Sequence, residues 1–422
     1  MSAPHRLPDN GFAALSSGLG GSDAVRALAE ARLSRHLLLI RLIADGWPGS
    51  AAERDHALGV LAQSQDRAAE PVTELLSYPL VGAWAARAVR RIRGATVSEV
   101  PVEAELGHLG AIAAAAVYRS GLDAEVTAYV RGGGVVLPTI GRVPLPRPEF
   151  APVRLTFHGG RMALPGSWQG LRRLSAETDG LRLDVAFDDL DPYRDGHHAP
   201  AADTVPAPEL SRWTEMFAEA WALLVRYLPE RAEELSVGLR SLVPLTNVGP
   251  GDARSSTVRD SFGTFGLTLP TSAAVFAVTL VHEFQHSKLS ALLDLIRLYD
   301  RSAPQTYYAP WRRDSRPIGG LLQGVYAFLG VADAWRSLRE CPGLADLAGR
   351  EFAALREQVN CALTELEAAG ALTAAGRRFA GGMRSTTDRM MAERLPGDAV
   401  RQARAALAAN HDAWRRRHGV PA

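Results

Sequence analysis

The chain has 422 residues, of which 47% are hydrophobic, enough to bury a full core as one large unit or as roughly two to three domains. Its 47 Lys and Arg residues nearly balance 46 Asp and Glu residues, so the charge gives no basis for binding nucleic acid or a membrane surface. The two cysteines, Cys341 and Cys361, are too few for a disulfide framework and lack the paired spacing of a thiolate metal site.

The N-terminal region, residues 1–122, is predicted to be helical. Its first residues lack the basic and apolar segments of a signal peptide, and no uninterrupted apolar run in the chain approaches about 18 residues. We therefore expect a cytoplasmic protein that does not cross a membrane. Apolar side chains recur at helical spacing after two candidate N-caps, Ser22 and Asp23, and further helical segments follow up to Gly121.

Residues 123–210 are predicted to form a β-rich region and a loop. Short alternating runs, such as AEVTAYV and PVRLTFH, are bounded by Gly, Pro or Asp and are typical of strands. Glycine-rich segments at residues 131–134 and 158–160 predict hairpin turns, so we expect a small, largely antiparallel sheet. Residues 191–210 are rich in Pro, Asp and Ala, which predicts a surface loop.

The last region, residues 211–422, is predicted to be helical again. Residues 211–236 have the pattern of one helix. The cap candidates Thr271 and Ser272 begin a longer helix that should run to about Tyr299 and is apolar nearly all round, as expected of a buried helix. The three regions together predict a mainly helical α+β fold, built as one compact unit in which helical layers pack round a small sheet and one long helix is buried.

This long helix carries two histidines four residues apart, His282 and His286, with Glu283 directly after the first. Positions i and i+4 project from one helical face, so both imidazoles can bind one cation through neutral ring nitrogens. Polar groups inside an apolar helix also need partners, because burying them unpaired costs about 2–7 kcal/mol. The spacing therefore predicts a metal site, in which Glu283 could be the general base of a zinc peptidase.

The third ligand of a zinc peptidase is hard to find in the sequence. Leu289 and Leu292 stand where metzincins have Gly and His, which excludes that class, and Asp333 is only a weak match for an aspartate ligand. Non-haem Fe(II) oxygenases instead need two His and usually one carboxylate, and leave positions for a bidentate co-substrate and O₂. Both kinds of metal site therefore stay open at this point.

The segment that follows carries side chains suited to a carboxylate. Arg312, Arg313 and Arg316 have planar forks that can bind one through paired hydrogen bonds. Tyr308 and its neighbours add hydroxyl and stacking groups. An arginine cluster of this kind would suit an oxygenase that binds an organic acid beside its metal.

Four segments occur in fixed order from about residue 100 to the C-terminal helices: ELGHLGAIAAAA, GGVVLPTIGR, LVHEFQHSKLSALLDL and YAPWRRDSRPIGGLLQGVYAFLGVADAWR. With these segments the chain resembles the HEXXH-motif domain proteins of actinobacterial peptide-modification clusters. Such proteins are similar to the α-ketoglutarate-dependent HExxH-type peptide β-hydroxylases, which act on ribosomally made precursor peptides. The resemblance implies an Fe(II)/2-oxoglutarate-dependent dioxygenase of RiPP biosynthesis that β-hydroxylates a residue of a precursor peptide with O₂.

Carried over to this chain, the resemblance assigns His282 and His286 as iron ligands. Its G-L-L-[HQ]-G element falls on residues 320–324, which implies Gln323 as the third ligand or as a hydrogen-bonding partner of the ligands. Glu283 would then lie beside the metal without acting as a proteolytic base. Arg312, with Arg313, Arg316 and Tyr308 as further candidates, would bind the distal carboxylate of α-ketoglutarate.

The resemblance also implies partners. The substrate would be the precursor peptide, and a radical SAM maturase of the same cluster is a further partner. Two alternatives remain: a zinc metallopeptidase of HExxH type, with Zn in place of iron, and a non-catalytic peptide-binding protein of a modification cluster.

Overall fold

The computed structural model describes residues 5, 7–163, 168–197, 199–247, 249 and 254–419. Its helices are α1 (Asp9–Ser16), α2 (Gly21–Asp45), α3 (Ala51–Arg67), α4 (Ala69–Ser77), α5 (Pro79–Ile92), α6 (Val102–Leu106), α7 (His108–Ser120), α8 (Ala207–Tyr227), α9 (Pro229–Gly238), α10 (Ala273–Leu295), α11 (Ile318–Leu338), α12 (Ala345–Ala368), α13 (Ala374–Ala392) and α14 (Gly397–His418). Its strands are β1 (Ala124–Tyr129), β2 (Gly134–Leu137), β3 (Gly141–Pro144), β4 (Pro152–His158), β5 (Arg161–Met162), β6 (Gln169–Gly170), β7 (Arg172–Thr178), β8 (Leu181–Phe187), β9 (Ser241–Pro244), β10 (Ser255–Thr257), β11 (Thr264–Leu267), β12 (Thr306–Tyr307) and β13 (Arg316–Pro317). The mainly helical α+β fold that the sequence predicts is confirmed.

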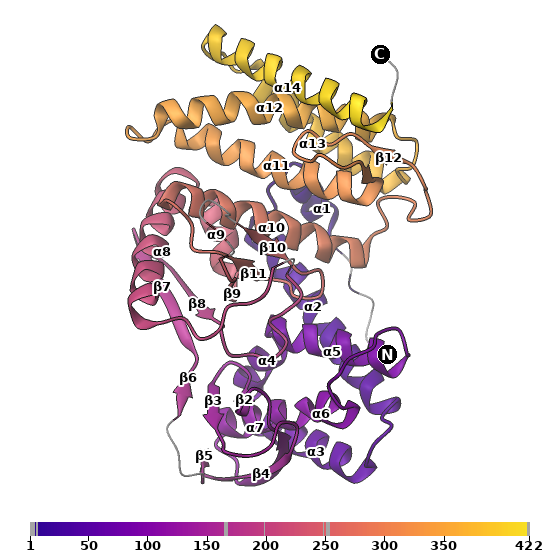
Figure 1. Ribbon diagram of the computed structural model, residues 1–422, viewed down its shortest axis with the longest axis vertical. Helices are drawn as coiled ribbons and strands as arrows, with labels where there is room; N and C mark the ends of the chain where they lie inside the picture. Colours follow the sequence, from indigo (N-terminus) through magenta and orange to yellow (C-terminus); the bar gives the residue numbers. More distant parts are fainter. Residues whose placement is uncertain are drawn as a thin grey trace.

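The buried apolar side chains form two large clusters. One lies in the N-terminal half, among α3 to α7 and the strands β1, β2 and β4. The other joins α1, α8 to α13 and the inner faces of β7, β8, β9 and β11. Figure 1 shows the N-terminal half at one end of the molecule and the helices α11 to α14 at the other, with α10 between them.

The strands of the described residues form four small sheets. Three are antiparallel, with the orders β1-β4-β5, β2-β3-β6 and β12-β13. The fourth has the order β10-β11-β9-β8-β7, and its central strand β9 runs parallel to both neighbours. The expected antiparallel pairing is therefore correct at the edges of this sheet and wrong at its centre. A parallel pair needs a long crossover, and α8 with α9 provides it between β8 and β9.

Several predicted boundaries are wrong for identifiable reasons. The single helix expected over residues 211–236 is divided into α8 and α9, because Leu228 has an extended φ of −135° and Pro229, which lacks an N–H, begins the second helix. Helix α2 begins at Gly21 instead of after the expected caps Ser22 and Asp23. The backbone N–H of Gly21 donates to the distant Glu234 Oε1 at 2.9 Å, so a tertiary contact supplies the cap.

The segment expected as a surface loop, residues 191–210, is partly buried. Asp191, Tyr193 and Val205 lie in the interior, and the N–H of Ala202 donates to the carbonyl of Pro244 beside β9. Its Asp and Pro residues make turns, as predicted, but the turns pack between the two halves of the molecule. Composition alone does not distinguish such a buried connection from an exposed one.

Helix α10, which carries both histidines, is buried along most of its length. It contacts α11, α8, α2 and the strands β10 and β11. Ser272 accepts a hydrogen bond from the N–H of Val275, so the predicted N-cap is confirmed. The helix ends at Leu295, four residues before the expected end, and Tyr299 instead forms a β-bridge with Leu372. The long buried helix is thus present, with a shorter C-terminal end.

Helix α11 packs against α10 and carries the predicted third position, Gln323. Among the described helices it is the one long and apolar enough to cross a membrane by length and composition. However, 72% of its most apolar window is buried inside the protein, which is typical of a core helix. Its apolar side chains contact α10 and α12.

Candidate functional site

His282 and His286 lie one turn apart on α10, with ring centroids 4.7 Å apart and ring planes at 85°. Both line a cavity of about 710 Å³. Burial lowers the pKa of His282 well below its usual value, and the neighbouring His286 lowers it further. His282 is therefore neutral near pH 7, which is the form that binds a metal ion.

Gln323 contacts the second histidine from α11. Its Oε1 lies 2.9 Å from His286 Nδ1, and its Nε2 donates to Ser290 Oγ at 3.2 Å. With Oε1 as the acceptor, the proton of a neutral His286 lies on Nδ1, and Nε2 carries the lone pair that a metal ion needs. The contact favours an orienting role of Gln323 over direct ligation.

Glu283 lies beside the histidine pair without bonding to it. Its side chain is buried, and Oε2 accepts a hydrogen bond from Thr257 Oγ1, on β10, at 2.6 Å. The other oxygen, Oε1, lies 3.9 Å from His282 Nε2, which is longer than a hydrogen bond. Strand β10 thus fixes the carboxylate next to the position that a ligand of His282 would occupy.

Aromatic rings and glycines of α11 shape the cavity. The Phe328 ring packs 5.0 Å from that of His282 and stacks on Trp311 at 4.5 Å. A Cβ atom at Gly324 would lie 2.5 Å from Trp311 Cζ2, and one at Gly319 would collide with Tyr299 Oη. The glycines of the GGLLQG segment therefore let two aromatic side chains approach the helix, and a larger residue would displace them.

Four arginines line the cavity, and no Asp or Glu of the described residues does. They are Arg259, Arg301, Arg312 and Arg316. Arg312 Nε and Arg316 Nη1 both donate to Asp314, at 2.9 and 3.3 Å, and Arg259 Nη2 pairs with Asp294 at 2.9 Å. The cavity thus combines two imidazoles with guanidinium groups, which favour anionic ligands.

Two predicted cofactor-binding residues lie elsewhere. Tyr308 is buried against α14, where its hydroxyl donates to Asn410 Oδ1 at 2.7 Å and its ring packs on His411 and Trp414. The carbonyl oxygen of Arg313 accepts a hydrogen bond from Arg417, also on α14. Neither residue lines the cavity, so the structure brings together His282, His286, Gln323, Arg312 and Arg316 but not these two.

Sequence reasoning missed Arg259, Tyr299 and Arg301. They lie in two separate segments, one after β10 and one after α10, and no motif surrounds them. Nearly all basic residues of this chain are arginines, since Lys288 is its single lysine. An isolated arginine in the sequence therefore gives no sign of a functional role.

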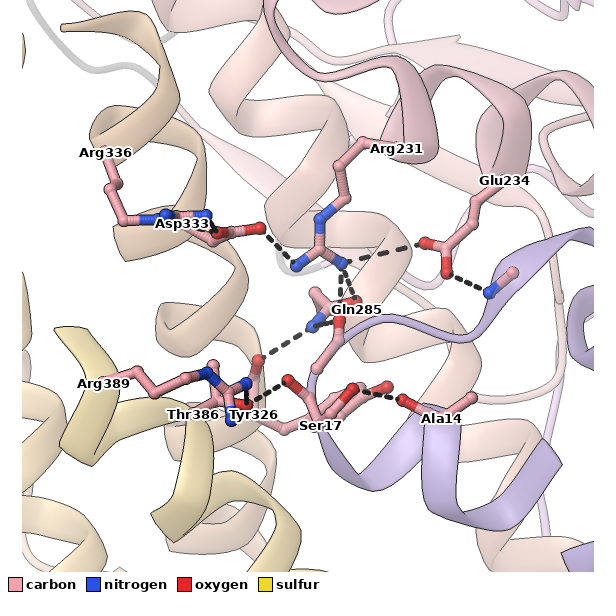
Figure 2. Close-up of polar contacts among 12 residues, drawn as sticks. Ala14, Ser17, Arg231, Glu234, Gln285, Tyr326, Asp333, Arg336, Thr386 and Arg389 are labelled. Atoms are coloured by element: carbon pink, nitrogen blue, oxygen red, sulfur yellow. Dashed lines mark hydrogen bonds and ion pairs between the residues drawn. The ribbon is translucent and has the colours of Figure 1, made fainter. Parts of the chain in front are cut away.

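Another face of α10 is held by a buried polar network (Figure 2). Gln285 Nε2 donates to the carbonyl oxygens of Gly18 and Tyr326 at 3.0 and 3.1 Å. Arg231 donates to Gln285 Oε1 at 3.2 Å and to Asp333 Oδ2 at 3.1 Å. The turn after α1 and the helices α9 and α11 therefore fix the rotation of α10, and with it the direction of both histidines.

This network also places Asp333, the weak match for a zinc ligand, and Lys288. Asp333 pairs with Arg231 and Arg336 and does not line the cavity, so it offers no support for an aspartate-type zinc site. Lys288 Nζ donates to Glu234 Oε2 at 2.6 Å, with both side chains buried. Lys288 therefore points away from the histidine pair.

The donor set fits a metal ion held by few protein ligands. Among the described residues, no group of three or more His, Cys, Asp and Glu side chains could hold a metal ion. The available donors are two imidazoles and the neighbouring amide of Gln323. A metal bound in this way would keep positions for oxygen ligands from a small molecule, and the arginines would favour an anionic one.

Comparison with known proteins adds no family assignment. The sequence matches no protein-family model, and no curated protein matches it significantly. The function must therefore be argued from the cavity itself.

Proposed function

We propose that the protein is an Fe(II)/α-ketoglutarate-dependent β-hydroxylase of a residue in a ribosomally made precursor peptide. The observation that carries the proposal is the cavity, whose described lining holds two adjacent histidines and four arginines but no Asp or Glu. A metal ion bound here would have no carboxylate ligand from the cavity lining. Its open coordination positions could be filled by the oxygen atoms of an organic acid.

His282 and His286 would hold the iron, and Gln323 would orient His286 through its Nδ1 proton. Arg312 or Arg316 would bind the distal carboxylate of α-ketoglutarate through a charge-assisted pair of hydrogen bonds. Phe328 packs against His282 and Trp311 stacks on Phe328, so apolar rings would lie beside the metal. When bound, iron and α-ketoglutarate together supply the oxidant for hydroxylation of an unactivated C–H bond.

The dimensions of the cavity leave space for a substrate residue. Its volume of about 710 Å³ lies within the range of roughly 300–1,000 Å³ of small-molecule sites, and α-ketoglutarate fills only part of it. An extended peptide could therefore place one side chain beside the cofactor. A radical SAM maturase would act on the same peptide elsewhere and needs no part of this cavity.

The proposal is tested by the visible spectrum of the metal-stripped protein after addition of Fe(II) and α-ketoglutarate without oxygen. We expect the charge-transfer band of a chelated keto acid, its loss in His286→Ala, and a higher α-ketoglutarate requirement in Arg312→Gln. Arg297→Gln is the matched control, because Arg297 is exposed near the end of α10 and does not line the cavity. A spectrum with no band in the wild-type protein would contradict the proposal.

A zinc metallopeptidase is the second candidate, and one distance favours it. Glu283 Oε1 lies 3.9 Å from His282 Nε2, close enough to contact a water molecule bound beside that histidine. Tight Zn(II) binding without the keto-acid band, together with peptide cleavage that Glu283→Gln abolishes, would favour this candidate. A non-catalytic peptide-binding protein would instead bind its peptide unchanged in His282→Ala.

A further inference from the structure

We infer that the peptide substrate carries a carboxylate at or next to the modified residue, and that Arg259 and Arg301 bind it. The inference rests on the proposed function and names the class of its substrate. It is drawn from the charges of the cavity, which exceed what α-ketoglutarate alone can balance.

The positive charge of the cavity lining is only partly neutralised by neighbouring acids. Arg312 and Arg316 share one carboxylate, Asp314. Arg259 shares Asp294 with two further arginines, Arg32 and Arg35. Arg301 forms no ion pair with any described residue, and its one printed hydrogen bond is to the carbonyl oxygen of Leu293 at 3.4 Å. Each aspartate therefore serves more than one guanidinium, and the cavity keeps a net positive potential.

The arginines come from three segments of the chain. Arg312 and Arg316 belong to the segment before α11, and their common partner Asp314 places them side by side. Arg259 follows β10, whereas Arg301 follows α10 with Tyr299 two residues before it. Arg259, Tyr299 and Arg301 line the same cavity, so the segment after β10 and the segment after α10 meet there.

One dicarboxylate cannot use both groups of arginines while it is bound to the histidine pair. Its keto-acid end would occupy the metal, and its distal carboxylate would take one guanidinium fork, for which Arg312 and Arg316 lie on the segment next to Gln323. Arg259 and Arg301 are then left without an anionic partner from the cofactor. Their side chains are largely solvent-exposed at the cavity rim, 56% in the case of Arg259, where an incoming peptide would meet them.

The shared chemistry is a carboxylate, which a peptide can supply from an Asp or Glu side chain or from its C-terminus. Three probes distinguish these sources: acetyl-Ala-Asp-Ala-amide, its Asn counterpart, and acetyl-Ala-Ala-Ala with a free C-terminus. Their affinities would be measured by calorimetry at low salt, under nitrogen, on the protein with Fe(II) and α-ketoglutarate. We expect the Asp probe to bind at least about tenfold more tightly than the Asn probe, since a hydrogen bond to a charged group contributes about 1.5–3 kcal/mol. Tighter binding of the third probe than of the Asn probe would assign the carboxylate to the C-terminus.

Arg259→Gln and Arg301→Gln should each weaken the Asp probe by roughly tenfold and leave the Asn probe unchanged. Both should keep the keto-acid band, whereas Arg297→Gln should change neither property. Loss of the Arg259 side chain is structurally tolerable because Asp294 keeps Arg32 and Arg35.

The inference is wrong if neither the Asp probe nor the probe with a free C-terminus binds more tightly than the Asn probe. It is also wrong if Arg259→Gln and Arg301→Gln bind the preferred carboxylate probe as the wild-type protein does. A band with equal probe affinities would keep the proposed function and reject the carboxylate site. Selective binding of the Asp probe through Arg259 and Arg301, without the band, would keep the carboxylate site and reject the proposed function.

Discussion

At the scale of single residues, Gln323 shows what a motif can and cannot predict. The resemblance singled out this position as a metal ligand or a hydrogen-bonding partner of the ligands, and the structure places its amide oxygen 2.9 Å from His286 Nδ1. Whether the amide binds a metal or orients a histidine depends on the rotamer of Gln323 and on the distance between α10 and α11. Neither quantity can be read from one sequence, because packing between helices sets both.

An orienting role predicts a moderate loss of metal affinity when Gln323 is replaced by Leu. The variant keeps the approximate size of the side chain but leaves His286 Nδ1 without its acceptor, and loss of such a partner typically lowers metal affinity by about 10–100-fold. His286→Ala should lower it far more. Competition with a coloured chelator measures both affinities.

Ser290→Ala is the control for Gln323→Leu, because it removes only the partner of the amide nitrogen. It should change metal affinity by less than Gln323→Leu does. An unchanged affinity in Gln323→Leu would show that His286 needs no orienting partner.

At the scale of elements, α10 has two polar faces: one lines the cavity and the other anchors the helix to its neighbours. One face presents the histidine pair to the cavity. Another face carries Gln285, which joins the network of Figure 2, and Lys288, which donates to Glu234. The sequence predicted the helix, and helical geometry places Lys288, two residues after His286, about 200° round the helix from it. It did not predict that Glu234, on α9, would serve both Lys288 and the N-terminus of α2.

Lys288→Met should destabilise the protein strongly. It leaves Glu234 buried without its ammonium partner, and removing one member of a buried pair typically costs about 3–5 kcal/mol. The double variant Lys288→Met/Glu234→Gln should regain part of this loss, because no unpaired carboxylate remains. Denaturant midpoints at unchanged slope measure both effects, and equal midpoints for the wild type and Lys288→Met would contradict the importance of the pair.

The same lysine predicts a pH dependence. Burial lowers the pKa of Lys288 from 10.5 to about 8, against the attraction of Glu234. Between these values the folded protein has released a proton that the unfolded chain still binds, so the free energy of unfolding contributed by Lys288 rises with pH. The stability difference between the wild type and Lys288→Met should therefore increase from pH 8 towards pH 10.5, and a decrease over this interval would contradict the assigned shift.

At the scale of the whole molecule, the sequence predicted the order of helical and β-rich regions but not how they join. Helix α2 contributes Val25 and Leu28 to one apolar cluster and Ile40 and Ile43 to the other. Between these groups it carries Arg32, which pairs with Asp294 at 2.9 Å. The periodicity of α2 is that of an ordinary amphipathic helix, so only the tertiary structure reveals that it spans both cores.

A helix shared by two cores should couple their unfolding. Ser34 lies in the middle of α2 and its side chain is exposed, so a substitution there contacts neither core directly. Proline at this position should destabilise the helix by about 3 kcal/mol or more. We expect the wild-type protein to unfold in one calorimetric transition and Ser34→Pro to unfold in two, with the N-terminal core melting separately. Ser34→Ala, which removes only the contact of the Ser34 hydroxyl with His5, should keep the single transition. If Ser34→Pro also melts in one step, the coupling must run through another contact, and the buried segment after β8, where Tyr193 joins the N-terminal cluster, is the next one to break.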